Sequence, residues 1–380
     1  MRLQAFIGAA SLALAAPAMA QDAEFVPETV SVQERIAPGA NVFVMDQNWS
    51  GASKINVLGA DDLSMKGNLS VGREGQMLLS ADGATLYTTS GYARRITYGE
   101  MEAVVHEFDV ATLTHRREFT ISNKRAMVES QPALLGFADG ERFLLVQNAT
   151  PATSIAVVDL ARGEQIAEIP TPGCWGALAT QGRGFLTLCG DGTVQAFAFE
   201  PDGSFGEPVR SAAPIFDPDA DALFTNPARV GADFVFASFG GNLLRVAMVD
   251  GVPTLVDSFS ITEGVEGDWA PGGSEVIAYH APSGTAFVLM HSGAEEGSHK
   301  DGAEEIWAVD LDAKAVLYRS PAHHENSIAA GQGETPVLFA VGESSTLTRY
   351  EVDPEARFAA KPAGEAEKMG GFPALVLTSQ

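Results

Sequence analysis

The chain has 380 residues, of which 46% are hydrophobic and only two are cysteine. This composition supports a large buried core, and it excludes both a disordered chain and a small disulfide-rich scaffold. With 49 acidic against 24 basic side chains the formal charge is −25, which argues against nucleic acid or an anionic membrane surface as a partner.

The first 20 residues predict a secretory signal peptide. Arg2 precedes an apolar run from about Leu3 to Ala16, and Ala-Met-Ala at residues 18–20 forms a cleavage site. A membrane anchor is the weaker alternative, because the apolar run is shorter than the ~20 residues of a bilayer span. We therefore expect cleavage after Ala20 and export to the periplasm. Residues 21–38 are acidic, contain proline and lack a pattern, so they predict a mobile N-terminal arm.

Residues 39–380 predict an all-β fold. Short runs rich in Val, Leu, Phe and Thr are broken repeatedly by Gly, Asp, Asn and Pro. The recurring unit is a strand, a tight turn, a second strand, a third strand that ends in a hydrophobic-Asp corner, and an outer strand. The clearest example predicts strands at residues 76–80, 86–90, 104–109 and 115–121.

The hydrophobic-Asp corners recur roughly every 40 to 50 residues, with one interval of about 60, which is typical of propeller blades. We therefore predict one seven-bladed β-propeller over residues 39–380. The apolar segment 374–377 is expected to pair with the first blade and close the ring, which removes an exposed sheet edge. Two β-sandwiches in series are the weaker alternative, because no Pro/Ser-rich linker divides the chain. The corners are Asp61, Asp109, Asp159, Asp202, Asp250, Asp310 and Asp353.

The two cysteines, Cys174 and Cys189, are fifteen positions apart. In an oxidising compartment this pair predicts one structural disulfide rather than a metal site or a reactive thiol. Closing a loop of that size is worth roughly 3 kcal/mol of stability when the gain is attributed to loop entropy.

Two segments between predicted strands are candidate contact surfaces. Residues 91–99 are irregular and contain two tyrosines and two arginines, residue types that are favoured at binding hot spots, although ordinary loop cover is an equal alternative. Residues 290–302 form a polar inserted loop on one face of the ring, with a binding role or plain solvation as the alternatives.

No strong catalytic motif is present. The chain lacks a nucleophile elbow, a phosphate-binding P-loop, an H-E-x-x-H helix and paired C-x-x-C motifs. Five of the seven histidines fall in the last third, but their spacing matches no compact ligand motif, so we expect exposed loop histidines and no metal site. These five are His280, His291, His299, His323 and His324.

Several segments together resemble the heavy chain of the quinoprotein amine dehydrogenases. The resemblance is closest to aromatic (aralkyl) amine dehydrogenase, extends to methylamine dehydrogenase, and spans about Val42 to Tyr350. The segments that carry it are residues 92–109, 146–155, 173–175, 188–192, 269–273 and 290–307.

The resemblance implies a seven-bladed heavy chain in a heterotetramer of two heavy and two light chains. The light chain would carry tryptophan tryptophylquinone, so that no catalytic or cofactor-binding residue is expected in this chain. The enzyme would convert a primary amine, with aromatic amines preferred, to an aldehyde and ammonia. It would then pass electrons to a blue-copper protein such as azurin or amicyanin.

Residue roles also follow from the resemblance. Cys174 and Cys189 correspond to the family's heavy-chain disulfide. Tyr92 is the candidate aromatic at the substrate entrance, with Ala93 as the alternative if the alignment shifts by one residue. The four tryptophans are expected to be core or interface aromatics: Trp49, Trp175, Trp269 and Trp307.

Two other functions are alternatives. One is a stand-alone exported propeller that binds a ligand or a protein. The other is a lactonase-type hydrolase, which would need acidic residues and a divalent metal at the central channel.

Overall fold

Antiparallel β-strands make up almost all of the regular structure of residues 33–380, the part of the chain that the computed structural model describes. The predicted signal peptide and residues 21–32 of the predicted arm lie outside these described residues. Arg35–Gln380 forms one compact unit. Within residues 33–380 the helical elements are single 3₁₀ turns, and no helix there has the length and apolar character needed to cross a membrane.

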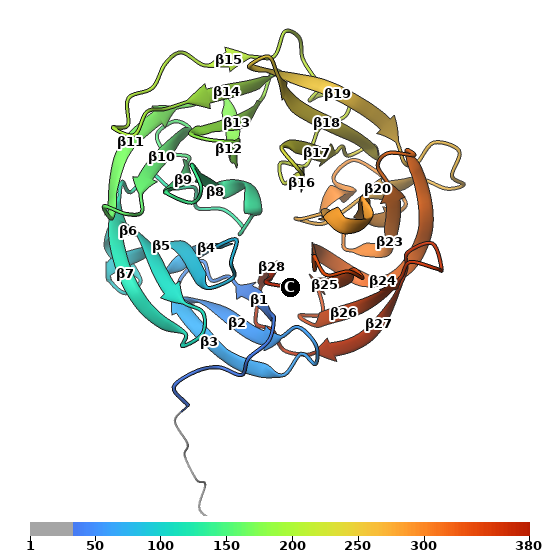
Figure 1. The fold of residues 1–380 in the computed structure, drawn as a ribbon, viewed down its shortest axis with the longest axis horizontal. Coiled ribbons are helices and arrows are strands. Elements are labelled where there is room, and N and C mark those ends of the chain that lie inside the picture. The colour runs from blue at the N-terminus through green and yellow to red at the C-terminus, as the bar shows by residue number, and fades with distance from the viewer. Residues whose placement is uncertain (1–32) are drawn as a thin grey trace, which may run out of the picture. The chain divides into compact units, whose positions relative to one another are not determined.

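Six antiparallel sheets stand around a ring, and in the five four-stranded sheets the strands follow one another from the centre outwards (Figure 1). The first three sheets have four strands each. They comprise β28 (Pro373–Thr378), β1 (Asn41–Asp46), β2 (Ser53–Gly59) and β3 (Met65–Val71); β4 (Arg73–Leu79), β5 (Thr85–Arg95), β6 (Tyr98–Asp109) and β7 (Thr114–Ile121); and β8 (Leu135–Ala138), β9 (Phe143–Asn148), β10 (Ser154–Asp159) and β11 (Glu164–Pro170).

The remaining three sheets are two of four strands and one of eight. They comprise β12 (Cys174–Ala179), β13 (Gly184–Cys189), β14 (Val194–Ala198) and β15 (Val209–Arg210); β16 (Ala228–Val230), β17 (Asp233–Ala237), β18 (Asn242–Val249) and β19 (Val252–Ser260); and β20 (Trp269–Pro271), β21 (Ile277–His280), β22 (Thr285–Ser292), β23 (Ala303–Asp310), β24 (Ala315–Ala330), β25 (Val337–Gly342), β26 (Leu347–Asp353) and β27 (Ala359–Ala366).

The last strand of the chain closes the ring. β28 is the innermost strand of the first sheet and pairs antiparallel with β1, with Val376 opposite Val44. Ala374, Leu375 and Val376 are buried. This confirms the predicted pairing of residues 374–377 with the start of the fold.

The eight-stranded sheet is held together by β24, which is 16 residues long. Its first part pairs with β23, where Ala315 lies opposite Asp310, and its last part pairs with β25, where Ala330 lies opposite Leu338. One continuous strand is therefore the outer strand for β20–β23 and the inner strand for β25–β27.

The predicted aspartate corners lie where strands end. Each of the seven aspartates lies at the end of a strand or just after it. The next strand along the chain is the outermost strand of that sheet or, after Asp310, the first part of β24. The Asp109 carboxylate accepts a hydrogen bond from the backbone N–H of Thr112 at 2.8 Å, and Asp310 accepts from Asp312 at 2.9 Å. An Asx side chain that satisfies the backbone of the next residues favours a turn at this point.

The core lies between neighbouring sheets. All residues of β9, β10, β13 and β25 are buried, because both faces of these strands pack against other sheets. Phe43 and Met77, for example, share a cluster between the first and second sheets, and Val105 and Leu144 share one between the second and third. Strands buried on both faces explain why the sequence shows continuous apolar runs.

The predicted disulfide is present. Cys174 begins β12 and Cys189 ends β13, and the register places the two residues directly opposite each other.

Residues 91–99 are not the irregular stretch that the sequence predicts. β5 continues to Arg95 and β6 begins at Tyr98, so the segment is the end of a long hairpin with its turn at residues 96–97. The side chain of Ile96 at this turn is 84% exposed. The hairpin extends beyond the core, which leaves its polar residues in solvent and explains why the segment resembles a loop in sequence.

Candidate docking face

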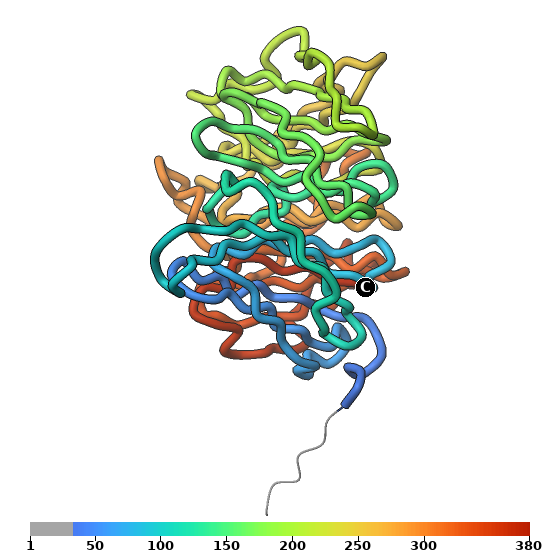
Figure 2. Tube along the Cα trace, turned by 90° about the vertical axis from the view of Figure 1, so that its left-hand side faces the viewer, coloured from blue at the N-terminus to red at the C-terminus, as the bar shows by residue number. Residues whose placement is uncertain are grey.

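One end of the ring carries the connections that reach furthest from the sheets. Consecutive strands of a sheet run in opposite directions. The connection between the second and third strands of a sheet therefore lies at the same end of the ring as the connection from its fourth strand to the next sheet. We name this end the hairpin face. Figure 2 shows the β5–β6 hairpin on the side of the ring opposite the C-terminus. The face carries residues 47–52, 96–97, 122–131, 293–302 and 367–372.

Large exposed apolar side chains gather on the hairpin face near the first two sheets. Their exposed fractions run from 39% for Tyr92 to 84% for Ile96. Exposed apolar groups that lie together mark binding surfaces more often than isolated ones do. We call this set the apolar patch: Trp49, Tyr92, Ile96, Tyr98, Met127 and Phe372.

One direct contact joins two members of the patch, and Arg73 links them to the second sheet. The rings of Trp49 and Phe372 meet edge to face with centroids 6.2 Å apart. The Arg73 guanidinium donates to the Trp49 carbonyl at 2.9 Å and approaches the Met101 sulfur at the base of the hairpin. The β1–β2 loop, residues 367–372 and the β5–β6 hairpin therefore form one connected surface.

A buried ion pair fixes residues 122–131 on this surface. The Arg125 guanidinium donates to the Glu74 carboxylate at 2.8 Å and to the carbonyls of Arg73 and Glu74, each at 3.0 Å. Arg125 and Glu74 are only 3% and 5% exposed. Burial lowers the pKa of Arg125, and Glu74 opposes that shift. The buried Arg125–Glu74 ion pair thus holds the segment that carries Met127 in place.

Tyr92 lies on β5 at the base of the hairpin, and its ring contacts the ring of His106 with centroids 5.8 Å apart. Burial raises the pKa of its phenol, while a hydrogen bond to Ser90 lowers it. Tyr92 and Ala93 line a cavity of about 540 Å3 together with Met101. Both candidates for the entrance residue therefore border the same cavity, and neither lies in the centre of the ring.

A second cavity of about 360 Å3 lies at the ring centre and opens among connections of the hairpin face. The His299 ring stacks on Phe239 with centroids 4.2 Å apart. Burial raises the pKa of Glu129, and the hydroxyl of Ser274 and the charge of Lys300 oppose this. The cavity is therefore partly aromatic and carries one acidic and one basic group from different connections. Its lining includes Glu129, Gln131, Phe224, Phe239, His299 and Lys300.

Glu275 lies beside this central cavity. Its carboxylate accepts a hydrogen bond from the Ser327 hydroxyl at 2.9 Å, and Ser274 and Asn326, its neighbours on the two segments, line the cavity. Although Glu275 keeps some contact with solvent, burial of the carboxyl raises its pKa to about 8. The folded protein thus holds this group protonated at pH values where an unfolded chain has lost the proton.

The pKa of Glu275 predicts that stability falls as pH rises. Between about pH 4.5 and pH 8 the unfolded chain is deprotonated at this position while the folded chain is not, so each rise in pH favours unfolding. Glu275→Gln keeps a neutral group and should remove this part of the pH dependence. Urea unfolding of both proteins at pH 5 and pH 8 measures it, and an identical pH dependence in the two would contradict the prediction.

The histidine prediction is wrong at two positions. His280 and His291 are 0% and 2% exposed. The His280 ring bonds to the Ser283 hydroxyl and to the Gly333 carbonyl, each at 2.8 Å, so it is a core residue with partners from two segments. His323 and His324 are exposed, as the sequence predicts, but they lie on β24 rather than in a loop.

The three-residue group of metal-ligating side chains found within residues 33–380 was missed by the sequence analysis. It comprises His106, His115 and Glu118 on β6 and β7, and it does not line the central cavity, where a lactonase-type site would need its carboxylates. The signal was available, because the Asp109 corner places His106 and His115 on neighbouring strands.

A closed ring of small antiparallel sheets defines a β-propeller-like fold. The model of the methylamine dehydrogenase heavy chain family matches residues 39–380. The chain therefore belongs to the quinoprotein amine dehydrogenase heavy chain family.

Relatives of this chain carry the same family name. It is 23% identical to the methylamine dehydrogenase heavy chain of Methylobacillus flagellatus over 75% of this chain and 70% of that one. It is also 23% identical to the heavy chain of Methylophilus methylotrophus, over 90% of this chain and 84% of that one.

Solved structures are similar to this chain in fold. A candidate 6-phosphogluconolactonase from Bacteroides fragilis superimposes with a TM-score of 0.58 at 14% identity, covering 92% of this chain and 99% of that one. A protein of unknown function from Desulfotomaculum acetoxidans gives 0.56 at 14% identity, covering 89% and 98%. At these identities the likeness shows the fold alone.

Proposed function

We propose that this chain is the heavy, non-catalytic subunit of a periplasmic amine dehydrogenase. Residues 1–20 are its signal peptide, residues 21–38 an N-terminal arm, and residues 39–380 a propeller of seven blades. The blade count takes the five four-stranded sheets together with the two halves of the eight-stranded sheet. Two such chains assemble with two light chains that carry tryptophan tryptophylquinone.

The observation that carries this proposal is the apolar patch on the hairpin face. Subunits that stay together bury interfaces of at least ~1,600 Å2 with apolar and aromatic centres. Trp49, Tyr98 and Phe372 supply aromatic anchors, and Arg73 and Arg95 supply the guanidinium groups that interfaces favour. The light chain would cover this patch and the cavity beside Tyr92.

The tryptophans of this chain do not fit a quinone of its own. Trp269 and Trp307 contact each other with ring centroids 5.7 Å apart, but Trp307 is fully buried and its indole N–H donates to Glu305 at 2.7 Å. The Arg319 guanidinium lies over both rings. An amine could not reach a quinone at Trp307, which supports placing the cofactor on the light chain.

The substrate is a primary amine, with an aromatic amine preferred. When bound, the quinone accepts the electrons of amine oxidation, and the products are an aldehyde and ammonia. The role of this chain is to exclude water and to line the entrance, for which Tyr92 or Ala93 is placed at the edge of the neighbouring cavity. Electrons leave to a blue-copper protein such as azurin or amicyanin.

Co-expression with the light chain tests the proposed function. We expect a complex with a quinone absorption band that oxidises arylalkyl amines faster than methylamine, and a heavy chain that is colourless and inactive when purified alone. Amine oxidation by the isolated heavy chain would overturn the division of labour.

Ile96→Asp tests the docking face directly. The Ile96 side chain is 84% exposed, so the substitution should leave the stability of the heavy chain unchanged but should weaken light-chain binding by roughly tenfold or more. Met65→Asp is the matched control, because Met65 is 54% exposed at the start of outer strand β3, away from the hairpin face. Surface plasmon resonance with the light chain measures both, and equal affinities for the two variants would exclude this face.

The two alternatives keep weaker support. The likeness to a candidate lactonase is one of fold, and the central cavity presents Glu129 next to Lys300 rather than a cluster of carboxylates. A stand-alone binding protein would have the same patch. It would be distinguished by purifying on its own, with no light chain bound to it.

A further inference from the structure

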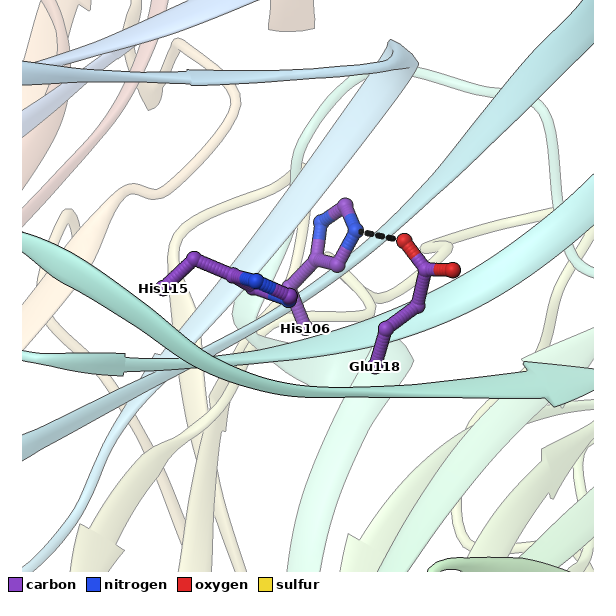
Figure 3. A group of neighbouring side chains, drawn as sticks. All are labelled: His106, His115 and Glu118. Carbon is purple, nitrogen blue, oxygen red and sulfur yellow. Dashed lines mark hydrogen bonds and ion pairs between the residues drawn. The ribbon is translucent and has the colours of Figure 1, made fainter.

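Three side chains on one face of the second sheet converge next to Tyr92, at the border of the apolar patch. His106 lies on β6, and His115 and Glu118 lie on β7 (Figure 3). The register places His106 opposite Glu118, and His115 opposite Phe108 two residues further along. Each of the three offers one ligand atom, and these atoms all lie within 4.8 Å of one another.

His106 is held in place by its surroundings. The residue is 6% exposed, and the rings of Tyr92, Phe108 and His115 contact its ring with centroids 5.8, 5.6 and 4.9 Å away. Its Nε2 lies 2.7 Å from the Glu118 carboxylate, while its buried Nδ1 has no hydrogen-bond partner within the described residues. The fixed ring therefore presents its Nε2 atom on the side where the Glu118 carboxylate lies, as two ligands of one cation would be arranged.

The other two ligands are free to adjust. His115 is exposed and the Glu118 side chain is 51% exposed, so rotation of either can bring its ligand atom closer to His106. The nearby cations are already paired, Arg116 with Asp109 and Arg117 with Glu107. Neither arginine between residues 106 and 118 is therefore left unpaired to repel a bound cation.

We propose that His106, His115 and Glu118 form a binding site for a divalent d-block cation of the zinc type. Two imidazoles and one carboxylate are the donor set of many zinc sites with three protein ligands, in which water takes the fourth position. Calcium and magnesium prefer sites made of oxygen ligands alone, so they are not expected to bind here. This inference is independent of the proposed amine dehydrogenase function.

Zinc binding to the mature heavy chain, purified without a polyhistidine tag, tests the site. Isothermal titration after chelator treatment should show one zinc ion per chain, and calcium in excess should not displace it. His115→Ala should lower the affinity by roughly tenfold to a hundredfold, because it removes a ligand and His115 is exposed. His323→Ala is the matched control, since His323 is also exposed and lies 3.8 Å from a carboxylate, that of Glu365.

Three results would overturn the proposal. They are no zinc binding to the unaltered chain at micromolar concentrations, equal affinity in His115→Ala, and loss of binding in His323→Ala. Glu118→Gln provides a second variant with almost unchanged shape, and it should weaken zinc binding if the carboxylate is a ligand. Thermal unfolding without zinc checks that each variant is folded, so weaker binding can be assigned to the site. Activity of the assembled enzyme plays no part in this test.

Discussion

A chain that ends after Phe372 is expected to fail to fold into a soluble monomer. It lacks β28, the innermost strand of the first sheet, and it loses the buried side chains of Leu375 and Val376, each worth about 1.5–3 kcal/mol. The inner edge of β1 would also be left unpaired, which invites aggregation. Since domains are stable by only about 5–15 kcal/mol, these losses remove a large part of the stability.

Soluble yield, size-exclusion chromatography and circular dichroism measure the effect of this truncation. Removing Gln380 alone is the control and should leave a folded chain, because β28 ends at Thr378. A synthetic peptide of residues 373–380, added during refolding of the truncated chain, should restore the soluble form. A truncated chain that unfolds at the same urea concentration as the full chain would contradict the role of β28 in closure.

Arg125→Met is expected to lower the free energy of unfolding by about 3–5 kcal/mol, the usual cost of breaking a buried ion pair from one side. The substitution leaves the Glu74 carboxylate in a residue that is only 5% exposed, without its closer partner and with only the Arg73 guanidinium, 3.6 Å away, to pair with it. It also removes the hydrogen bonds that tie residues 122–131 to the start of β4. Hydrogen exchange of those residues should therefore become faster.

A double-mutant cycle separates the ion pair from simple loss of packing. Glu74→Gln alone should also be destabilising, whereas Arg125→Met combined with Glu74→Gln should cost less than the sum of the two, because no uncompensated charge remains. Urea unfolding at pH 7 measures all four proteins. Additive effects would show that the two side chains are not coupled.

Much of the fold could be predicted because it rests on local signals. The aspartate corners satisfy the backbone of the next few residues, so Asp109 and Asp310 mark their turns without any knowledge of the rest of the chain. The closing strand could be predicted from its apolar residues, since an edge of that kind has to be covered. The hairpin at residues 91–99 could not, because its strands extend past the core and lose the alternation that marks a half-buried strand.

The candidate surfaces depend on contacts between distant segments, which a single sequence does not contain. Arg125 and Glu74 are 51 residues apart, and nothing in either neighbourhood distinguishes a buried ion pair from two exposed charges. His280 finds its partner at Gly333, 53 residues away, and therefore resembles an exposed histidine in sequence. His106 and His115 are the exception, because one hairpin holds both of them.

The continuity of β24 has a mechanical consequence. At several other joints an outer strand leads to the next inner strand through a longer connection, such as residues 122–131 or 211–227, which can bend without breaking strand pairs. Between β23 and β25 the same strand serves both partners, so a large movement at this joint would break strand pairs. If the ring widens or twists when a partner binds, we expect the joints with longer connections to take up most of the movement and β20–β27 to stay together.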